Sequence, residues 1–181
     1  MDVECLRRKY RIHLETPRFV LRPLVTEDSD WLARLFTDRD VNRFLLEDPC
    51  TPEQARRTAE AVVSLDLMRG RWGCWAIEDK TTGAVHGWTE LSKLRPWSGP
   101  SDEIGLSYVL GVGSWGRGIA TEAAGRLLRH AFEVLHEDRV MAVIMADNAA
   151  SRRVLEKLGM RSIGNPFADR LNLQYFQIGD P

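Results

Sequence analysis

The sequence has few of the features that mark exported, metal-binding or membrane-spanning proteins. Its three cysteines, Cys5, Cys50 and Cys74, are widely spaced and form no CxxC pair, so they indicate neither a disulfide framework nor a zinc site. The four histidines lack ligand spacing, and we expect no metal. No run approaches the ~18 apolar residues of a membrane-spanning helix, and residues 1–9 contain no apolar signal core. These absences predict a cytoplasmic protein with no membrane partner.

A large net charge is absent as well. The 25 lysines and arginines nearly balance the 26 aspartates and glutamates, which argues against a general attraction to nucleic acid. A length of 181 residues, of which 44% are hydrophobic, suits one buried core. We therefore expect a single domain over residues 1–181, with residues 1–13 as an N-terminal extension and no nucleic-acid partner. Any anion must be bound by local groups.

Hydrophobic periodicity predicts a mixed α/β chain. A capping box at Thr51-Pro52-Glu53-Gln54 marks the start of one helix, and Gly159 marks the end of another. We predict strands at 19–24, 72–78, 84–94, 103–110, 139–146, 161–163 and 173–178. The predicted helices span 28–38, 51–69 and 149–158, and a fourth follows the glycine-containing turn described next. The loop at 95–102 is expected either to reach over a pocket or to be solvated.

The most informative segment is the turn that connects the strand at 103–110 to the fourth helix. It reads Ser114-Trp115-Gly116-Arg117-Gly118-Ile119-Ala120-Thr121-Glu122-Ala123. Backbone N–H groups at a helix start lack intrahelical partners, and the positive end of the helix dipole lies behind them. Glycines leave those groups open to a ligand. The segment therefore predicts a binding site for a phosphate or diphosphate.

The same region also matches a dinucleotide-binding pattern. Gly111-Val112-Gly113-Ser114-Trp115-Gly116 fits G-x-G-x-x-G, between a strand and a helix as that pattern requires. However, the acidic residues about 20 positions later, Glu137 and Asp138, precede the next strand rather than end it. Most of the other strands are joined as hairpins. We therefore interpret Gly111 and Gly113 as incidental, and Gly116, Gly118 and Ala120 as the working residues.

Three motifs in order resemble the GNAT superfamily of N-acetyltransferases. Residues 115–120 are similar to its acetyl-CoA motif, in which Gln or Arg, two residues, Gly, one residue and Gly or Ala follow one another. Trp115 replaces the Gln or Arg, as is typical of the ribosomal-protein N-terminal acetyltransferase (RimJ/RimL-like) branch. Residues 148–160 resemble a later helix motif with Asn148 and Ser151, and residues 14–24 resemble the opening strand of that branch.

This resemblance implies a fold and an activity. The fold would be a mixed α/β domain with a central twisted sheet of about seven mostly antiparallel strands flanked by about four helices. The activity would be transfer of the acetyl group of acetyl-CoA to a primary amine, at a protein N-terminus or on a small molecule, by direct attack in a ternary complex. A non-catalytic acyl-CoA sensor and transfer of another short acyl group are the alternatives. The oligomeric state would be monomer or homodimer.

The resemblance also implies site residues. The pantetheine arm would lie beside the strand at 106–110, with a backbone N–H near Val109 or Leu110 facing the thioester carbonyl. Coenzyme A binding would involve Tyr108, Val109, Leu110, Trp115, Gly116, Arg117, Gly118, Ile119, Ala120, Thr121, Asn148, Ser151 and Arg152. The candidate catalytic residues are Glu103, Glu90 and Ser151. Leu155 stands where many members have a tyrosine that serves the leaving thiolate, which makes Ser151 the nearest candidate donor. Helix capping is the structural alternative for Asn148 and Ser151.

Overall fold

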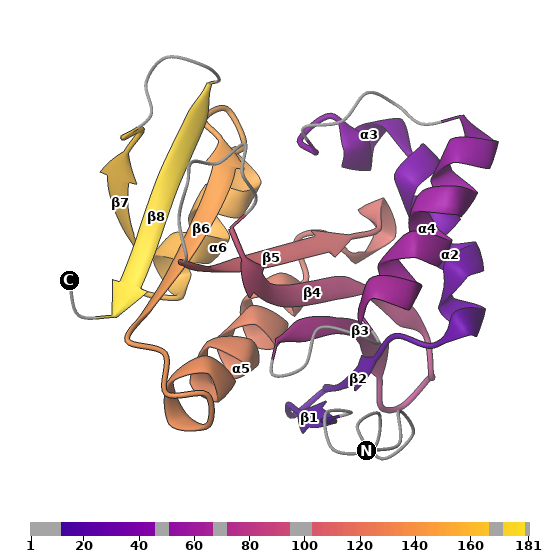
Figure 1. Ribbon diagram of the computed structural model, residues 1–181, viewed down its shortest axis with the longest axis horizontal. Coiled ribbons are helices and arrows are strands. Elements are labelled where there is room, and N and C mark those ends of the chain that lie inside the picture. Colours follow the sequence, from indigo (N-terminus) through magenta and orange to yellow (C-terminus); the bar gives the residue numbers. More distant parts are fainter. Residues whose placement is uncertain (1–11, 46–50, 67–71, 95–102, 167–171, 180–181) are drawn as a thin grey trace.

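The computed structural model describes residues 12–45, 51–66, 72–94, 103–166 and 172–179 as one sheet flanked by helices (Figure 1). The strands are β1 (Leu14–Glu15), β2 (Phe19–Pro23), β3 (Gly73–Asp79), β4 (Val85–Lys93), β5 (Ile104–Leu110), β6 (Arg139–Met145), β7 (Arg161–Gly164) and β8 (Leu173–Gly179). The α-helices are α2 (Ser29–Thr37), α3 (Arg39–Asn42), α4 (Pro52–Asp66), α5 (Ile119–Glu133) and α6 (Ala149–Lys157), with 3-10 turns η1 (Thr26–Asp28) and η3 (Val112–Ser114).

The eight strands lie in the order β1-β2-β3-β4-β5-β6-β8-β7. Among the strand pairs of the described chain, only β5 with β6 is parallel, and α5 makes the crossover between them. The mixed, mostly antiparallel sheet is therefore confirmed. It also rules out the doubly wound parallel sheet that a dinucleotide site would need.

The expected counts of about seven strands and about four helices are each one too low. The additional strand, β1, has two residues, and the additional helix, α3, has four. Elements this short carry no periodicity that a sequence pattern can detect. The side chain of Asp38 starts α3 by accepting the backbone N–H groups of Asp40 and Val41.

Local sequence signals correctly predicted the start of α4 and the end of α6. Thr51 and Gln54 exchange the two hydrogen bonds of a capping box, Gln54 N to Thr51 Oγ1 at 3.3 Å and Thr51 N to Gln54 Oε1 at 2.9 Å. Gly159 follows α6 with φ +80°, and the N–H of Met160 reaches back to the carbonyl of Leu155. The predicted loop at 95–102 lies outside the described residues.

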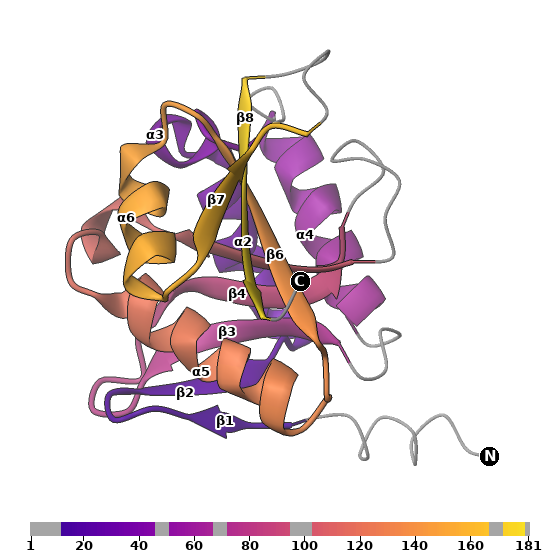
Figure 2. The same cartoon turned by 90° about the vertical axis from the view of Figure 1, so that its left-hand side faces the viewer.

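Helices cover both faces of the sheet (Figures 1 and 2). One core packs α5 and the buried Leu155 of α6 against one face, and the second core packs α2 and α4 against the other. Because side chains alternate along a strand, Leu91 of β4 enters the first core and Trp88 enters the second. No helix of the described segments is long and apolar enough to cross a membrane.

The sheet divides between β5 and β6. Their pairing is limited to Ile104 with Val140 and Gly105 with Met141 at the start of both strands. Beyond this junction the two strands run in different directions (Figure 1). Residues 106–110 of β5 are thus paired with β4 on one side and have no partner among the described strands on the side of β6. We call the space along this unpaired edge the β5–β6 opening.

Candidate active site

The turn into α5 has the backbone of an anion site. Gly116 and Gly118 have φ of +71° and +74°, a region that side-chain-bearing residues rarely adopt. The first hydrogen bond of α5 runs from Glu122 N to Gly118 O at 3.0 Å. In the described chain, the N–H groups from Gly116 to Thr121 have no main-chain acceptor outside the helix, and the first turn of a helix supplies none inside it. We name residues 116–121 the cradle.

The cradle is anchored to the ends of β4 and β5. The N–H of Gly111 donates to the carbonyl of His86 at 3.0 Å. The Oγ of Ser114 forms a hydrogen bond of 2.8 Å with the Nδ1 of the same histidine. The indole Nε1 of Trp115 donates to the carbonyl of Leu110 at 2.9 Å, while 44% of this residue remains exposed. These contacts fix the turn relative to the strand that precedes it.

The register of β5 decides which N–H groups face the opening. Gly111 N bonds to His86 O and Leu94 N bonds to Glu103 O, and bonded pairs alternate with non-bonded pairs in an antiparallel ladder. The N–H of Val109 is therefore directed at β4. Tyr108 and Leu110 direct theirs toward the opening, where β6 no longer pairs with β5. Of the two predicted backbone donors, the register favours Leu110 over Val109.

The start of α6 is linked to β5 by a hydrogen bond between Tyr108 and Ser151. The Asn148 side chain accepts the Ser151 N–H at 3.0 Å, so Asn148 is an N-cap. The Tyr108 hydroxyl donates to the Ser151 carbonyl at 3.2 Å. Burial raises the pKa of Tyr108, although its bond to Ser151 opposes the shift, so the phenol stays protonated near neutral pH. Leu155 is buried in the core beside α5.

The two candidate carboxylates occupy different surroundings. Glu90 is 5% exposed and lies opposite Ser107 of β5, and Ser107 is exposed although its strand is central in the sheet. Glu103 lies at the closed end of the β5–β6 opening, where Arg139 donates to both of its carboxylate oxygens. The structure therefore places Glu90 next to an uncovered part of the sheet and Glu103 in an ion pair.

The predicted cation Arg152 is also engaged. Its Nη2 donates to the carbonyl of Ala146 at 2.6 Å, which ties α6 to the end of β6. Arg117, by contrast, is exposed in the cradle. Sequence reasoning missed a third arginine, Arg18, whose side chain reaches the cradle from the start of β2. Its position in the opening motif was visible, but its contact with residues about 100 positions away was not.

Comparison with known proteins agrees with this geometry. Residues 18–161 match the acetyltransferase (GNAT) domain. The chain belongs to the GNAT family. The N-acetyltransferase p20 of Bacillus licheniformis, itself uncharacterized, is 31% identical over 152 residues, which cover 83% of each chain. The domain match and the name of this relative identify an acetyl-CoA-dependent acyltransferase with N-acetyltransferase activity in general.

Solved structures share the GNAT fold. An acetyltransferase from Agrobacterium tumefaciens superposes with a TM-score of 0.78 and 22% identity, over 93% of this chain and 95% of that one. Spermidine N-acetyltransferase from Vibrio cholerae, solved with CoA and spermine, has a TM-score of 0.70 and 16% identity, over 89% and 95%. Within the described residues of the present GNAT chain, no three His, Cys, Asp or Glu side chains are grouped as metal ligands.

Proposed function

We propose that this GNAT enzyme transfers the acetyl group of acetyl-CoA to a primary amine by direct attack in a ternary complex. The observation that carries the proposal is the run of N–H groups from Gly116 to Thr121 that have no main-chain acceptor in the described chain, beside the β5–β6 opening. The cradle would bind the diphosphate through backbone donors and the helix dipole. The pantetheine arm would lie along the unpaired edge of β5 as an added strand does.

The reaction forms a C–N bond and breaks a C–S bond. The amine nitrogen attacks the thioester carbonyl, whose oxygen gains negative charge that the N–H of Leu110 would stabilise. The tetrahedral intermediate then expels the thiolate of coenzyme A, which takes a proton, while the amine loses one. An alkyl amine with a pKa of ~10.4 is protonated at pH 7 by a margin worth ~4 to 5 kcal/mol, so a base is needed. We assign this role to Glu90.

The acceptor is proposed at the level of its chemistry. A small amine is supported by the V. cholerae neighbour that holds spermine, and a protein N-terminus is supported by the resemblance of residues 14–24 to the RimJ/RimL-like branch. An α-amine with a pKa near 8 is protonated at pH 7 by only ~1 kcal/mol, so it needs less help from a base than an alkyl amine does.

The activity is tested by incubating the protein with acetyl-CoA, a thiol reagent and a panel of N-terminal peptides, amino acids and polyamines. We expect release of coenzyme A with at least one amine, and acetyl-CoA should raise the melting temperature while NAD(P)H should not. Binding of acetyl-CoA without release of coenzyme A for any amine would favour a sensor. No binding at all would refute the proposed donor.

Ser151→Ala tests the proposed proton donor to the thiolate. We expect kcat to fall by about 10-fold with little change in the Kd of acetyl-CoA, because the hydroxyl would act only as the C–S bond breaks. The bond from the Ser151 N–H to Asn148 is a backbone contact and survives the change, so α6 should keep its start. Single-turnover kinetics and calorimetry measure the two quantities. An unchanged kcat would return Ser151 to a structural role, and Ser162→Ala on the exposed strand β7 is the control.

A further inference from the structure

Arg18 connects the start of β2 to the cradle through its whole guanidinium group. Nη1 and Nη2 each donate to the carbonyl of Arg117 at 3.2 Å, and Nε donates to Oε2 of Glu122 at 2.7 Å. These partners lie 99 and 104 positions away in the sequence. One planar side chain therefore holds both a peptide group of the cradle and a side chain in the first turn of α5.

Glu122 is held by Arg18 at both of its oxygens. Its Oε1 accepts the backbone N–H of Arg18 at 3.0 Å, while Oε2 accepts Nε. Although partial burial opposes the shift, hydrogen bonds from Thr16 and Arg18 hold the pKa of Glu122 below its usual value. The carboxylate is therefore charged at neutral pH and cannot rotate freely toward the cradle.

The contact with Arg117 determines the direction of a neighbouring donor. In a trans peptide the C=O and the following N–H point in opposite directions. Because Arg18 binds the Arg117 carbonyl, the N–H of Gly118 is directed away from Arg18 and toward the other side of the cradle. Gly118 has φ +74°, and because glycine tolerates either sign of φ, the local backbone alone does not select this orientation of the peptide.

The charge arrangement has a second effect. A carboxylate in the first turn of a helix is attracted to the helix dipole, but it also repels a bound phosphate. Arg18 neutralises Glu122 at this point and leaves Arg117 as an exposed cation. The ion pair contributes little to folding, since 47% of the Arg18 side chain and 20% of the Glu122 side chain are exposed.

We propose that Arg18 and Glu122 are a positioning pair for the diphosphate of acetyl-CoA. Arg18 fixes the Arg117–Gly118 peptide so that its N–H faces the diphosphate, and Glu122 fixes Arg18 while its own charge is cancelled. This inference rests on the proposed function, because it requires that the cradle bind the diphosphate.

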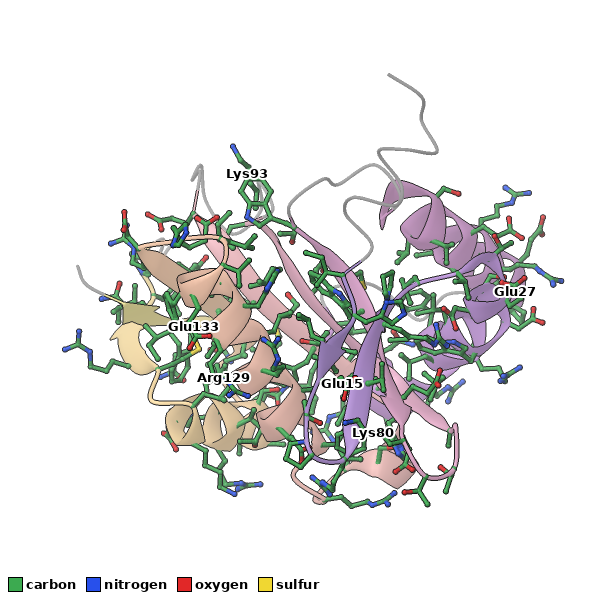
Figure 3. All side chains as sticks on the ribbon, turned by 90° about the horizontal axis from the view of Figure 1, so that it is seen from below. Glu15, Glu27, Lys80, Lys93, Arg129 and Glu133 are labelled. Carbon is green, nitrogen blue, oxygen red and sulfur yellow. The ribbon has the colours of Figure 1, made fainter. Side chains whose placement is uncertain are left out.

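Arg18→Ala tests the pair with two acetyl donors. We expect the KM of acetyl-CoA to rise by about 10-fold at nearly constant kcat, because one aligned donor and one positive charge are lost. The kcat/KM of S-acetylpantetheine, which lacks the diphosphate, should not change. The melting temperature should stay within about 3 °C of wild type. Arg129→Ala is the matched control, since Arg129 is an exposed arginine farther along α5 (Figure 3).

A rescue experiment separates positioning from general damage. Arg18→Ala leaves the Glu122 charge uncompensated, so Glu122→Gln added to Arg18→Ala should recover part of the lost acetyl-CoA affinity. Arg18→Lys keeps the charge but loses the planar fork, and its KM should lie between wild type and Arg18→Ala. Equal losses for acetyl-CoA and S-acetylpantetheine, or an unchanged KM for acetyl-CoA, would overturn the inference. Failure of the wild-type protein to bind acetyl-CoA would instead overturn the proposed function.

Discussion

Replacing Gly118 with valine is expected to raise the Kd of acetyl-CoA by at least about 100-fold, a loss of ~3 kcal/mol. Gly118 has φ +74°, and a β-branched residue there is a genuine outlier. A Cβ at this position would meet only the Arg18 Nη2, at 3.7 Å, so the cost is not an internal clash. The loss is expected from two sources. One is backbone strain of ~1 to 3 kcal/mol, and the other is a valine side chain that occupies the space where the diphosphate must approach.

Calorimetry with acetyl-CoA measures this loss, and Gly113→Val is the matched control. Gly113 lies in the same turn, has no positive φ, and would place a Cβ with nothing within 4 Å. Its substitution should leave the affinity nearly unchanged. This comparison also tests whether the first glycines of the G-x-G-x-x-G pattern are incidental. Similar losses at Gly113 and Gly118 would mean that the cradle has been assigned to the wrong residues.

The sequence predicted the elements that carry long patterns or strong end signals. The helix after the glycine-containing turn, the capping box at Thr51 and the Gly159 stop were all predicted, because their signals depend on residues a few positions apart. The mixed sheet followed from the hairpin signals and the resemblance to a known family. The two-residue β1 and four-residue α3 were missed because such lengths have no period.

The site was predictable only where its residues are neighbours in the chain. Residues 116–121 are continuous in the chain, so the prediction that they bind an anion rests on local physics alone. The direction of the β5 N–H groups depends on pairing with β4, and the sequence does not determine that register. The Glu103–Arg139 pair and the Arg18–Glu122 pair likewise require strand and helix positions set by the whole fold.

The two carboxylates that the sequence left open now have distinct expected roles. Arg139 engages both oxygens of Glu103 at the junction where β5 and β6 still pair. That contact is suited to holding the closed end of the opening together. Glu90 lies on the sheet face that carries Trp88 and opposite the exposed Ser107, which is where we expect an acceptor amine to approach the later half of β5.

Glu90→Gln is therefore expected to lower kcat by about 100-fold or more, with little change in the Kd of acetyl-CoA. The change keeps the side-chain volume but removes the negative charge that would accept a proton from the amine or hold its cation. Steady-state kinetics with the best amine of the panel, together with calorimetry for acetyl-CoA, measure the two effects. Glu103→Gln is the matched control: kcat should change little, and the melting temperature should change by no more than about 3 °C, because the Glu103–Arg139 pair is partly exposed, as the Arg18–Glu122 pair is. The opposite ranking of the two variants in kcat would assign the base to Glu103 and make Glu90 a buried structural carboxylate.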